Sequence, residues 1–435
     1  MTDKRTWRVG VAGLGTVGAG LLTFLSEHPD FAPADARASI TGVSARSRSR
    51  PRPFDIAALP WFDDPVALAT SPQTDLFVEL IGGSDGPAKA AVEAALRAGK
   101  PVVTANKALI AEHGAELAAL AEAKGVPLLF EAAVMGGVPA VKIVREALVG
   151  DEIRSIAGIL NGTCNYILTE MEATGRAFAE VLAEAQRLGY AESDPTMDVG
   201  GFDAAHKISI LAALAFGCAP NYAAAEIEGI TGVELLDIQL ARDLGYRIKL
   251  VASADRSPDG VLVRVHPSLA PLAHPLAQAG GALNALFIEG ARTGRIFIQG
   301  PGAGAGPTAA AVAADIADVM AGAVRPVFQS PAGELSPFTP VDPSKSLGRA
   351  YLRLSVKDEP GVIAAVSETL AEAGVSIESF LQKPVENAPE SLKGGVPIVL
   401  TTHAVAESVL KAAIERIASL PAVLDRPRLL RIARI

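Results

Sequence analysis

The spacing of apolar residues predicts alternating strands and helices in the first third of the chain. Short runs rich in Val and Ile predict strands, and Ala-rich stretches between them predict helices. The expected strands are residues 8–12, 39–45, 75–81, 101–104 and 128–131, and the expected helices are residues 17–26, 88–98 and 111–124. Strands that alternate with helices form a parallel sheet with right-handed crossovers. The pattern therefore predicts an α/β domain, a doubly wound sheet of the Rossmann type, over residues 1–134.

The pattern changes near residue 135. Long helical stretches now alternate with strand-like segments: helices at 140–148, 163–173, 178–188 and 203–216, and strands at 155–160, 247–254 and 260–266. This predicts an α+β domain with its own sheet over residues 135–299. A segment rich in Pro and Gly, residues 300–307, then leads into an Ala-rich helix at 308–321. We expect residues 300–328 to pack against the first domain and complete it.

The last quarter of the chain has a third pattern. Residues 329–348 are dense in Pro, Ser and Gly and lack periodicity, which is typical of a linker. Beyond the linker, the expected elements are a strand at 350–356, a helix at 362–373, strands at 376–382 and 395–402, a helix at 406–419 and a strand at 428–432. This β-α-β-β-α-β order is ferredoxin-like, and it predicts a separate domain over residues 349–435.

Composition narrows the class of protein. The chain has 435 residues and a net charge of −9, which argues against nucleic acids and anionic membranes as partners. The two cysteines, Cys164 and Cys218, have no metal-ligand spacing, and so few thiols favour a reducing compartment. The N-terminus lacks the apolar region of a signal peptide, and no apolar stretch is long enough to span a bilayer. We therefore expect a cytoplasmic protein.

A glycine-rich turn gives the first chemical signal. Gly13, Gly15 and Gly18 follow the first expected strand and open the first expected helix. In this fingerprint the first glycine allows a tight turn, the second lets the backbone approach a pyrophosphate, and the third lets helix and strand pack closely. Thr16 and Val17 then lie at the helix N-terminus, whose N–H groups bind phosphate. The surrounding βαβ unit favours a dinucleotide site over a simple glycine-rich turn.

The end of the second strand bears on which dinucleotide binds. An NAD enzyme usually carries Asp or Glu there, whereas this chain has Ser44-Ala-Arg46-Ser-Arg48-Ser-Arg50. Arginine can pair with the 2′-phosphate of NADP, which an acidic group would repel. NADP(H) is therefore preferred, with NAD(H) possible, and Arg46 is the first expected contact and Arg48 the second. A solvated basic loop is the alternative.

Two clusters supply candidate catalytic groups. Thr104 and Lys107 follow a strand at the sheet edge where ligands bind in open α/β folds. Asp203 and Lys207, four residues apart, share a helix face. A surface ion pair is the alternative, but residues 208–216 are almost wholly apolar, so this lysine begins a buried helix. Partial burial and close carboxylates tune a lysine towards proton transfer.

The chain resembles homoserine dehydrogenase over about its first 325 residues. The resemblance lies in the segments GLGTVG, DLFVELIGG, GKPVVTANKALIA, EAAVMGGVP, LNGTCNYIL, GYAESDPTMDVGGFDAAHK and GPGAGAGPTAAAV. It implies reversible reduction of L-aspartate 4-semialdehyde to L-homoserine with NAD(P)H, a step in threonine, methionine and isoleucine biosynthesis. The remaining residues resemble an ACT domain, with residues 356–362 as its first strand-to-helix turn.

The resemblance also implies residue roles. Lys207 would donate the proton, Lys107 would bridge nicotinamide and substrate, and Asp203 would complete the catalytic group. Glu192 and Asp203 would hold the substrate, supported by Asp198. The remaining implied contacts are Thr104 and Gly304 for the cofactor, and Glu131, Val134, Gly136 and Val138 for a monovalent cation, usually sodium.

For the C-terminal region, the ACT resemblance implies an amino-acid effector, with threonine the expected one, at the turn marked by Asp358 and Gly361. A domain used only for assembly is the alternative. Family interfaces imply a homodimer or homotetramer. Two other functions stay open: another amino-acid dehydrogenase, and a non-catalytic amino-acid sensor on a nucleotide-binding scaffold. The sensor predicts loss of the reactive cluster, whereas its lysines and carboxylates are all present.

Overall fold

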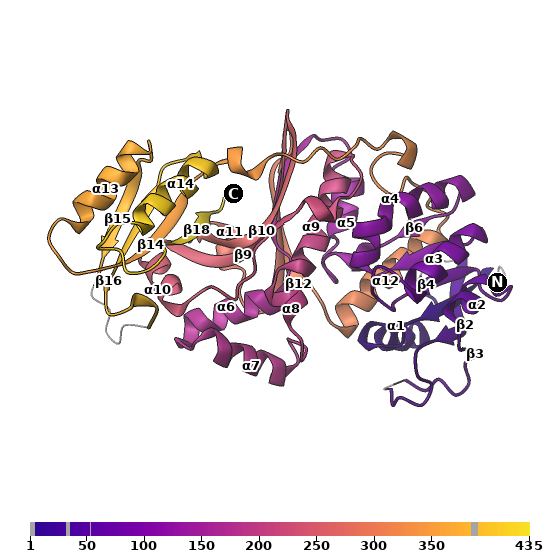
Figure 1. Ribbon diagram of the computed structural model, residues 1–435. Helices are drawn as coiled ribbons and strands as arrows, with labels where there is room; N and C mark the ends of the chain where they lie inside the picture. Colours follow the sequence, from indigo (N-terminus) through magenta and orange to yellow (C-terminus); the bar gives the residue numbers. More distant parts are fainter. Residues whose placement is uncertain (1–4, 32–34, 53, 384–389) are drawn as a thin grey trace.

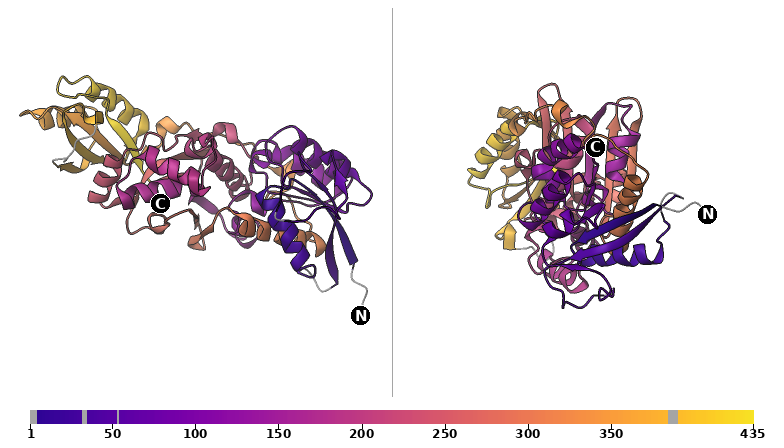
Figure 2. Two further views of the ribbon diagram at one scale, coloured as in Figure 1. Left: turned by 90° about the horizontal axis from the view of Figure 1, so that it is seen from below. Right: turned by 90° about the vertical axis from the view of Figure 1, so that its right-hand side faces the viewer.

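The computed structural model describes residues 5–31, 35–52, 54–383 and 390–435. These residues form three regions arranged in a row, with the N-terminal domain at one end and the C-terminal domain at the other (Figure 1). A view from below shows the same elongated arrangement (Figure 2). The middle domain therefore has two boundaries, one with each of its neighbours.

The N-terminal domain is a six-stranded parallel sheet. Its strands are β1 (Arg5–Ala12), β2 (Ala36–Ser44), β3 (Trp61–Phe62), β4 (Leu76–Glu79), β5 (Val102–Thr104) and β6 (Leu128–Leu129). They lie in the order β3-β2-β1-β4-β5-β6, which confirms the doubly wound fold. The order reverses between β1 and β4, so the loops that follow these strands diverge and leave room for a ligand at their carboxyl ends.

Helices cover both faces of this sheet. One face packs against α2 (Pro65–Thr70), α3 (Pro87–Arg97) and α4 (Lys107–Lys124). The other packs against α1 (Thr16–Glu27) and α12 (Ala305–Met320). Helix α12 is far from this domain in sequence, yet Val312 and Ile316 are buried in the same apolar cluster as Val9 and Val11 of β1.

The middle domain is built on a mixed sheet. Its strands are β7 (Ile153–Ile159), β9 (Tyr246–Ser257), β10 (Gly260–Pro271), β11 (Leu283–Gly290) and β12 (Gly294–Pro301), in the order β12-β11-β7-β9-β10. Its helices are α5 (Ala140–Lys142), α6 (Gly162–Thr174), α7 (Phe178–Leu188), α8 (Thr196–Val199), α9 (Phe202–Phe216), α10 (Leu235–Asp243) and α11 (Pro275–Gln278). The α+β architecture agrees with the sequence, but β11, β12 and α10 were not predicted. The expected helix 140–148 is instead α5 followed by a π-helical turn, Ile143–Ala147.

The C-terminal domain has the predicted ferredoxin-like order. Its elements are β14 (Ala350–Val356), α13 (Val362–Glu372), β15 (Ile377–Gln382), β16 (Val396–Thr402), α14 (Glu407–Ala418) and β18 (Arg428–Ile432). The strands lie in the order β18-β14-β16-β15, and β18 also pairs with β10 of the middle domain. The sheets of the two domains are therefore joined edge to edge, a continuity that the sequence did not predict.

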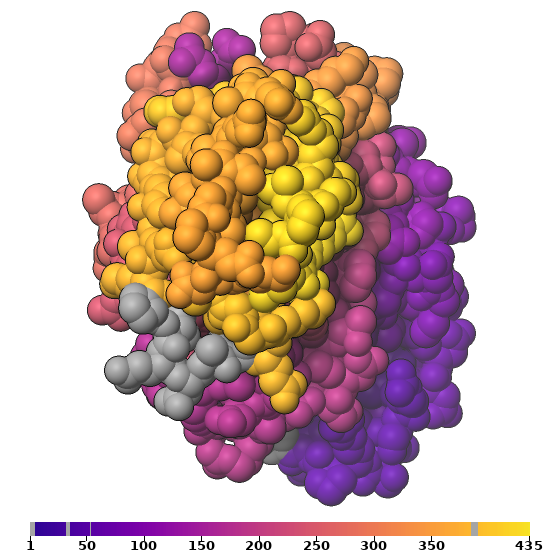
Figure 3. Space-filling model, turned by 60° about the vertical axis from the view of Figure 1, so that its left-hand side comes forward, coloured from indigo at the N-terminus to yellow at the C-terminus, as the bar shows by residue number. Residues whose placement is uncertain are grey.

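The segment expected to be a linker is partly ordered. It contains the short strand β13 (Leu347–Gly348), which pairs with β17 (Val405–Ala406). Figure 3 shows the C-terminal domain from its outer side, in front of the middle domain. Among the described residues, no helix is both long and apolar enough to cross a bilayer.

Candidate active site

The glycine turn after β1 fits a dinucleotide pyrophosphate. Gly13 has a φ of +99°, and a Cβ there would lie 2.2 Å from the carbonyl oxygen of Leu80. A Cβ on Gly18 would lie 2.1 Å from the carbonyl oxygen of Gly13, so helix and strand touch. A Cβ on Gly15 would meet nothing within 4 Å, and α1 has no side-chain cap. Open space in front of uncapped N–H groups is what a phosphate requires.

A surface hollow of about 620 Å³ begins at this turn. It runs from Gly15 and Thr16 along α1 to the basic loop and to the start of α12 at Ala305. The described residues that line it include Arg50 and Arg52 but neither of the arginines named from the sequence. Those two, Arg46 and Arg48, are exposed on the same loop.

One arginine shapes the basic loop. The Arg52 guanidinium donates hydrogen bonds to the carbonyl oxygens of Ser47 (2.5 Å), Arg50 (2.9 Å) and Arg48 (3.2 Å). The Arg52 guanidinium therefore contributes its positive charge to the loop, but its Nη1 and Nη2 donors are already bonded to backbone carbonyl oxygens. Arg50 also lines the hollow, and among the described residues its guanidinium donates no hydrogen bond to the loop backbone.

A buried carboxylate orders the sheet edge beside the hollow. Glu79, at the end of β4, is fully buried and accepts hydrogen bonds from the N–H groups of Ile81 (2.6 Å) and Gly82 (3.0 Å) and from the Thr104 hydroxyl (2.5 Å). It thereby joins the loops after β4 and β5. The sequence analysis did not single out Glu79, although a carboxylate that ends an apolar strand is a usable signal. Asn106 then caps α4, so Lys107 occupies the first position of that helix.

Two lysines and one carboxylate meet where the N-terminal and middle domains face each other. Asp203, on α9, lies 2.6 Å from Lys107 Nζ through Oδ1 and 2.8 Å from Lys207 Nζ through Oδ2. Lys207 also donates to the carbonyl oxygen of Leu160 at 2.8 Å. The Asp203 and Lys207 side chains are only 6% and 10% exposed, whereas that of Lys107 is 39% exposed. The Asp203–Lys207 pair is therefore buried, and Lys107 opens to solvent.

Burial and charge separate the two lysines chemically. Burial lowers the pKa of Lys207, against the opposing effect of Asp203. The charge of Asp203 raises the pKa of Lys107. Burial alone would raise the pKa of Asp203, but the two lysines hold it well below its usual value. Of the two lysines, Lys207 is therefore the one that gives up its proton more readily.

An asparagine that the sequence analysis did not select connects the carboxylates. Asn161 Nδ2 donates to Asp198 Oδ1 at 2.7 Å and to Asp203 Oδ2 at 2.9 Å. Thr163, also not selected, donates to the carbonyl oxygen of Tyr190 at 2.7 Å and lies 3.3 Å from Asp198 Oδ2. Burial and the charge of Asp203 raise the pKa of Asp198. The sequence did contain a signal for both residues, because the segment LNGTCNYIL is one of those that carry the family resemblance. No role was assigned to its Asn or Thr.

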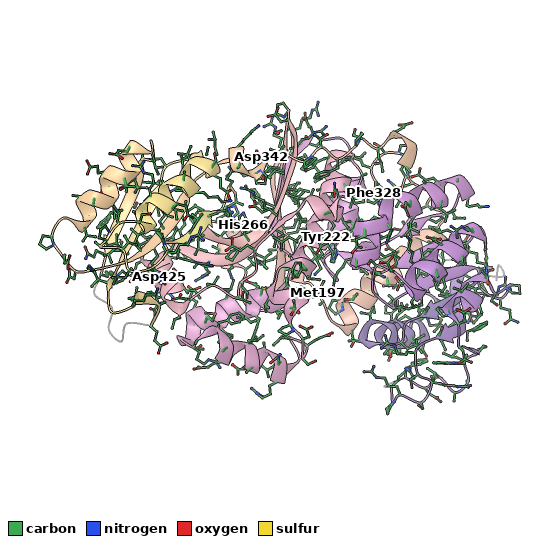
Figure 4. All side chains as sticks on the ribbon, in the orientation of Figure 1. Met197, Tyr222, His266, Phe328, Asp342 and Asp425 are labelled. Carbon is green, nitrogen blue, oxygen red and sulfur yellow. The ribbon has the colours of Figure 1, made fainter. Side chains whose placement is uncertain are left out.

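The remaining predicted residues lie at different distances from this centre. Glu192 is exposed, and its charge reaches Lys107. Cys164 is buried, and burial raises its pKa well above the usual value, which suits a packed residue. His206, which adjoins Lys207 in sequence, stacks on Tyr222 and lies 3.5 Å from Glu112 Oε1. In Figure 4, Tyr222 and Met197 lie on the side of the middle domain that faces the N-terminal domain.

The residues expected to bind a monovalent cation fit one in part. The Glu131 carboxylate accepts hydrogen bonds from the N–H groups of Val141 (3.0 Å) and Lys142 (2.8 Å), so it caps α5. The carbonyl oxygens of Val134 and Gly136 accept no hydrogen bond from the described residues, whereas that of Val138 accepts one from Ala140. Free carbonyl oxygens are suitable ligands for a hard cation.

A second buried carboxylate lies beside Glu131. Asp315, on α12, is fully buried and accepts a hydrogen bond from Glu131 N at 2.8 Å. Its other oxygen has no hydrogen-bond partner among the described residues and lies 3.7 Å from Lys142 Nζ. Burial and the charge of Glu131 raise the pKa of Asp315 to about 7.

Comparisons with known proteins agree along the whole chain. The family model of homoserine dehydrogenase matches residues 139–317, that of the homoserine dehydrogenase NAD-binding domain residues 13–131, and that of the ACT domain residues 350–422. A homoserine dehydrogenase of Pseudomonas aeruginosa is 43% identical over 425 residues, 96% of each chain. One of Neisseria gonorrhoeae is 42% identical over 95% of this chain and 96% of its own.

Solved structures give the same result. A homoserine dehydrogenase from Thiobacillus denitrificans superposes with a TM-score of 0.91 at 39% identity, covering 100% of this chain and 99% of that one. A hyperthermophilic archaeal homoserine dehydrogenase mutant in complex with NADPH superposes with a TM-score of 0.64 at 26% identity, covering 73% of this chain and 98% of that one.

Proposed function

Because the chain belongs to the homoserine dehydrogenase family, we propose that Lys107, Asp203 and Lys207 are the catalytic groups of its reaction. The family assignment makes the chain an NAD(P)-dependent oxidoreductase that acts on a CH–OH group, interconverting L-aspartate 4-semialdehyde and L-homoserine. It decides against the non-catalytic sensor and against another amino-acid dehydrogenase. The observation that supports the residue roles is the bridge from Lys107 of the N-terminal domain through Asp203 to Lys207.

The proton is assigned to Lys207. When bound, the nicotinamide cofactor supplies the hydride that reduces the aldehyde carbon. The aldehyde oxygen gains negative charge, and the Lys207 ammonium stabilises and protonates it; in the reverse direction neutral Lys207 accepts the hydroxyl proton. Its depressed pKa supports both roles, because each protonation state is then accessible. Asp203 fixes the ammonium, and the more exposed Lys107 contacts cofactor and substrate.

The proposal also assigns residues to the substrate and to the cofactor. We propose that Glu192 and Asp203 hold the amino and hydroxyl groups of the substrate, with Asp198 supporting the same pocket. Gly13, Gly15, Thr16, Val17 and Gly18 would hold the pyrophosphate, with Thr104 and Gly304 beside it. NADP(H) is preferred in this proposal because residues 45–52, directly after β2, carry four arginines and no carboxylate, and Arg46, Arg48 and Arg50 are exposed there.

Further parts of the proposal concern ions, effectors and assembly. A monovalent cation, sodium, would bind the free carbonyl oxygens of Val134 and Gly136. L-Threonine would bind the C-terminal domain at the turn where Gly361, with a φ of +90°, begins α13 without a side-chain cap. We also propose a cytoplasmic homodimer or homotetramer, and domain limits of 1–134 with 300–328, 135–299 and 349–435, joined by the segment 329–348.

The decisive experiment compares two buried lysines. Lys207→Met should lower kcat about 10²- to 10⁴-fold with NADPH and aspartate semialdehyde, because the proton donor is lost. NADPH affinity should stay within about 3-fold, since Lys207 does not line the glycine turn. Lys249→Met is the matched control: Lys249 is 1% exposed in the same domain, and its ammonium contacts Asn165 and the carbonyl oxygen of Ala279.

The control should lose stability but keep kcat within about 3-fold, because Lys249 lies outside the proposed catalytic group. Near-normal turnover of Lys207→Met would remove Lys207 from its role. The same assay with NADPH and NADH measures the cofactor preference directly, and a titration with L-threonine tests the effector.

A further inference from the structure

We propose that Asn161 is a positioning residue of the active site, whose single amide holds Asp198 and Asp203 in place and apart. This inference rests on the proposed role of Lys207. Asn161 is 4% exposed and lies at the N-cap of α6, facing α8 and α9. Its two amide hydrogens go to two different carboxylates, at 2.7 Å and 2.9 Å.

The orientation of this amide is fixed by a third contact. Asn161 Oδ1 accepts a hydrogen bond from Cys164 N at 2.8 Å, as the cap of α6. An amide turned by 180° would place its NH2 group against that N–H donor and its oxygen against two carboxylates. Both contacts would be repulsive, so the hydrogen-bond network determines the assignment of oxygen and nitrogen. The donors must face Asp198 and Asp203.

An N–H donor placed between two carboxylates reduces the repulsion between them, as a shared proton would. Neighbouring carboxylates repel each other, and such pairs commonly keep one proton between them. With Asn161 in this position, each carboxylate receives a hydrogen from the amide, which opposes the rise in the Asp198 pKa that burial and Asp203 cause. The two lysines keep Asp203 ionised, and the amide holds its Oδ2 atom in place 2.8 Å from Lys207 Nζ.

The turn that carries Asn161 also positions the lysine. Lys207 Nζ donates to the carbonyl oxygen of Leu160, the preceding residue, at 2.8 Å. Residues 160 and 161 thus contact both members of the Asp203–Lys207 pair, one through a carbonyl oxygen and one through an amide. A shift of this turn would move the ammonium and its counter-ion together.

The test changes the charge of the amide while keeping its shape. The titratable groups around it are Asp198 on α8, Asp203 and Lys207 on α9, Lys107 on α4, Cys164 on α6 and Glu192 in the loop before α8. Asn161→Asp can still accept from Cys164 N, so α6 remains capped, but it brings a third carboxylate beside Lys207. This should raise the Lys207 pKa by about one unit.

Homoserine oxidation requires neutral Lys207, so the rise of kcat with pH should move up by about one unit, and kcat on the rising limb of the profile should fall about 10-fold. KM for the cofactor should not change. Asn161→Ser keeps an acceptor for the helix cap and removes the bridge without adding charge; it should lower kcat with a smaller shift. If Asn161→Asp does not fold, this variant carries the test, and a normal kcat in it would overturn the proposal.

Asn165→Asp is the matched control. Asn165 is also buried on α6, but its amide donates to the carbonyl oxygens of Ala279 and Leu283 and its oxygen accepts from Lys249. The control should lower thermal stability and leave the pH profile unchanged. An equal shift in both variants, or none in Asn161→Asp, would exclude the positioning role. Failure of the Lys207→Met test would instead refute the proposed function itself.

Discussion

The middle domain meets each of its neighbours through a buried ion-pair cluster, and the two clusters are built differently. At the N-terminal boundary, Asp203 pairs with Lys107 and Lys207. At the C-terminal boundary, Asp237 of α10 is fully buried and pairs with Arg353 of β14, through Nε at 2.6 Å and Nη2 at 3.2 Å. Each cluster centres on a carboxylate that is nearly inaccessible to solvent.

The two clusters differ in the type of cation and in whether a cationic side chain is exposed to solvent. Arg353 makes a two-pronged contact, the Tyr351 hydroxyl donates a third hydrogen bond to Asp237, and the Arg353 side chain is only 6% exposed. Asp237 raises the pKa of Arg353 against the effect of burial, so this guanidinium cannot exchange protons. The other cluster uses lysines, whose pKa values respond to burial, and Lys107 opens to solvent. The arginine cluster stabilises the boundary between two domains. The lysine cluster, which is partly exposed to solvent, can also transfer protons.

The largest expected effect comes from breaking the C-terminal cluster. Asp237→Ala would leave the buried Arg353 guanidinium only the partly exposed Glu234 carboxylate, 3.3 Å from its Nη2 atom, which costs about 3 kcal/mol. Urea unfolding should show this loss, with the transition of the C-terminal region shifted most. Turnover of the folded protein should stay within about 3-fold, because the cluster lies at the opposite boundary from Lys207. Tyr351→Phe, which removes one hydrogen bond, should cost only about 1 kcal/mol. Equal losses in the two variants would contradict the assignment.

Exchanging the cation sharpens the comparison. Lys207→Arg should preserve the charge beside Asp203 yet reduce kcat about 100-fold, or about 2.7 kcal/mol in barrier, because a guanidinium does not release its proton. The converse variant, Arg353→Lys, should keep turnover and lose stability, since a lysine cannot make the two-pronged contact. Steady-state kinetics and thermal melts on both variants complete the test. An active Lys207→Arg protein would show that the charge alone is sufficient.

The sequence predicted the parts of the molecule that depend on local pattern. The parallel sheet and the ferredoxin-like domain were predicted because their apolar runs are long and their turns are rich in Gly and Pro. Strands β11 and β12 were missed because they form a hairpin whose second strand is only partly buried, so its alternation is weak. The Asp203–Lys207 pair was predictable because four residues separate its members on one helix.

Contacts between distant residues could not be read from local pattern. Asp237 and Arg353 are 116 residues apart, and nothing near either one indicates the other. The same holds for Asn161 and Asp203, separated by 42 residues. The family resemblance located the motifs, but it did not show that the Asn161 amide lies between two of the predicted carboxylates. The arginine loop is a further case, because its alternating sequence does not indicate which side chains turn towards the hollow.

A third buried carboxylate, Asp315, extends the comparison, because it has fewer partners than Asp203 or Asp237. Its pKa is raised to about 7, above the value of 3.8 for an unperturbed carboxyl. The native state therefore holds this proton more tightly than the unfolded chain does. The contribution of Asp315 to stability falls as pH rises from about 4 to about 7, and is lowest above that range.

Asp315→Asn should remove this dependence. An amide has the shape of the protonated acid and can still accept from Glu131 N, so the variant should match the parent protein only near pH 4, and its gain in stability should be smaller at pH 5.5 than at pH 7. Between pH 5.5 and pH 7 the advantage of the variant should grow by about 2 kcal/mol, because the unfolded parent chain ionises Asp315 while the folded parent keeps its proton. Urea midpoints of both proteins at the two pH values measure the difference. A bound cation beside Glu131 would favour the ionised acid, so sodium in place of a bulky organic cation should shrink the gap. If the two proteins differ in stability by the same amount at both pH values, Asp315 is already ionised, as Asp203 is. The Lys142 ammonium, 3.7 Å away, would then be sufficient to stabilise its charge.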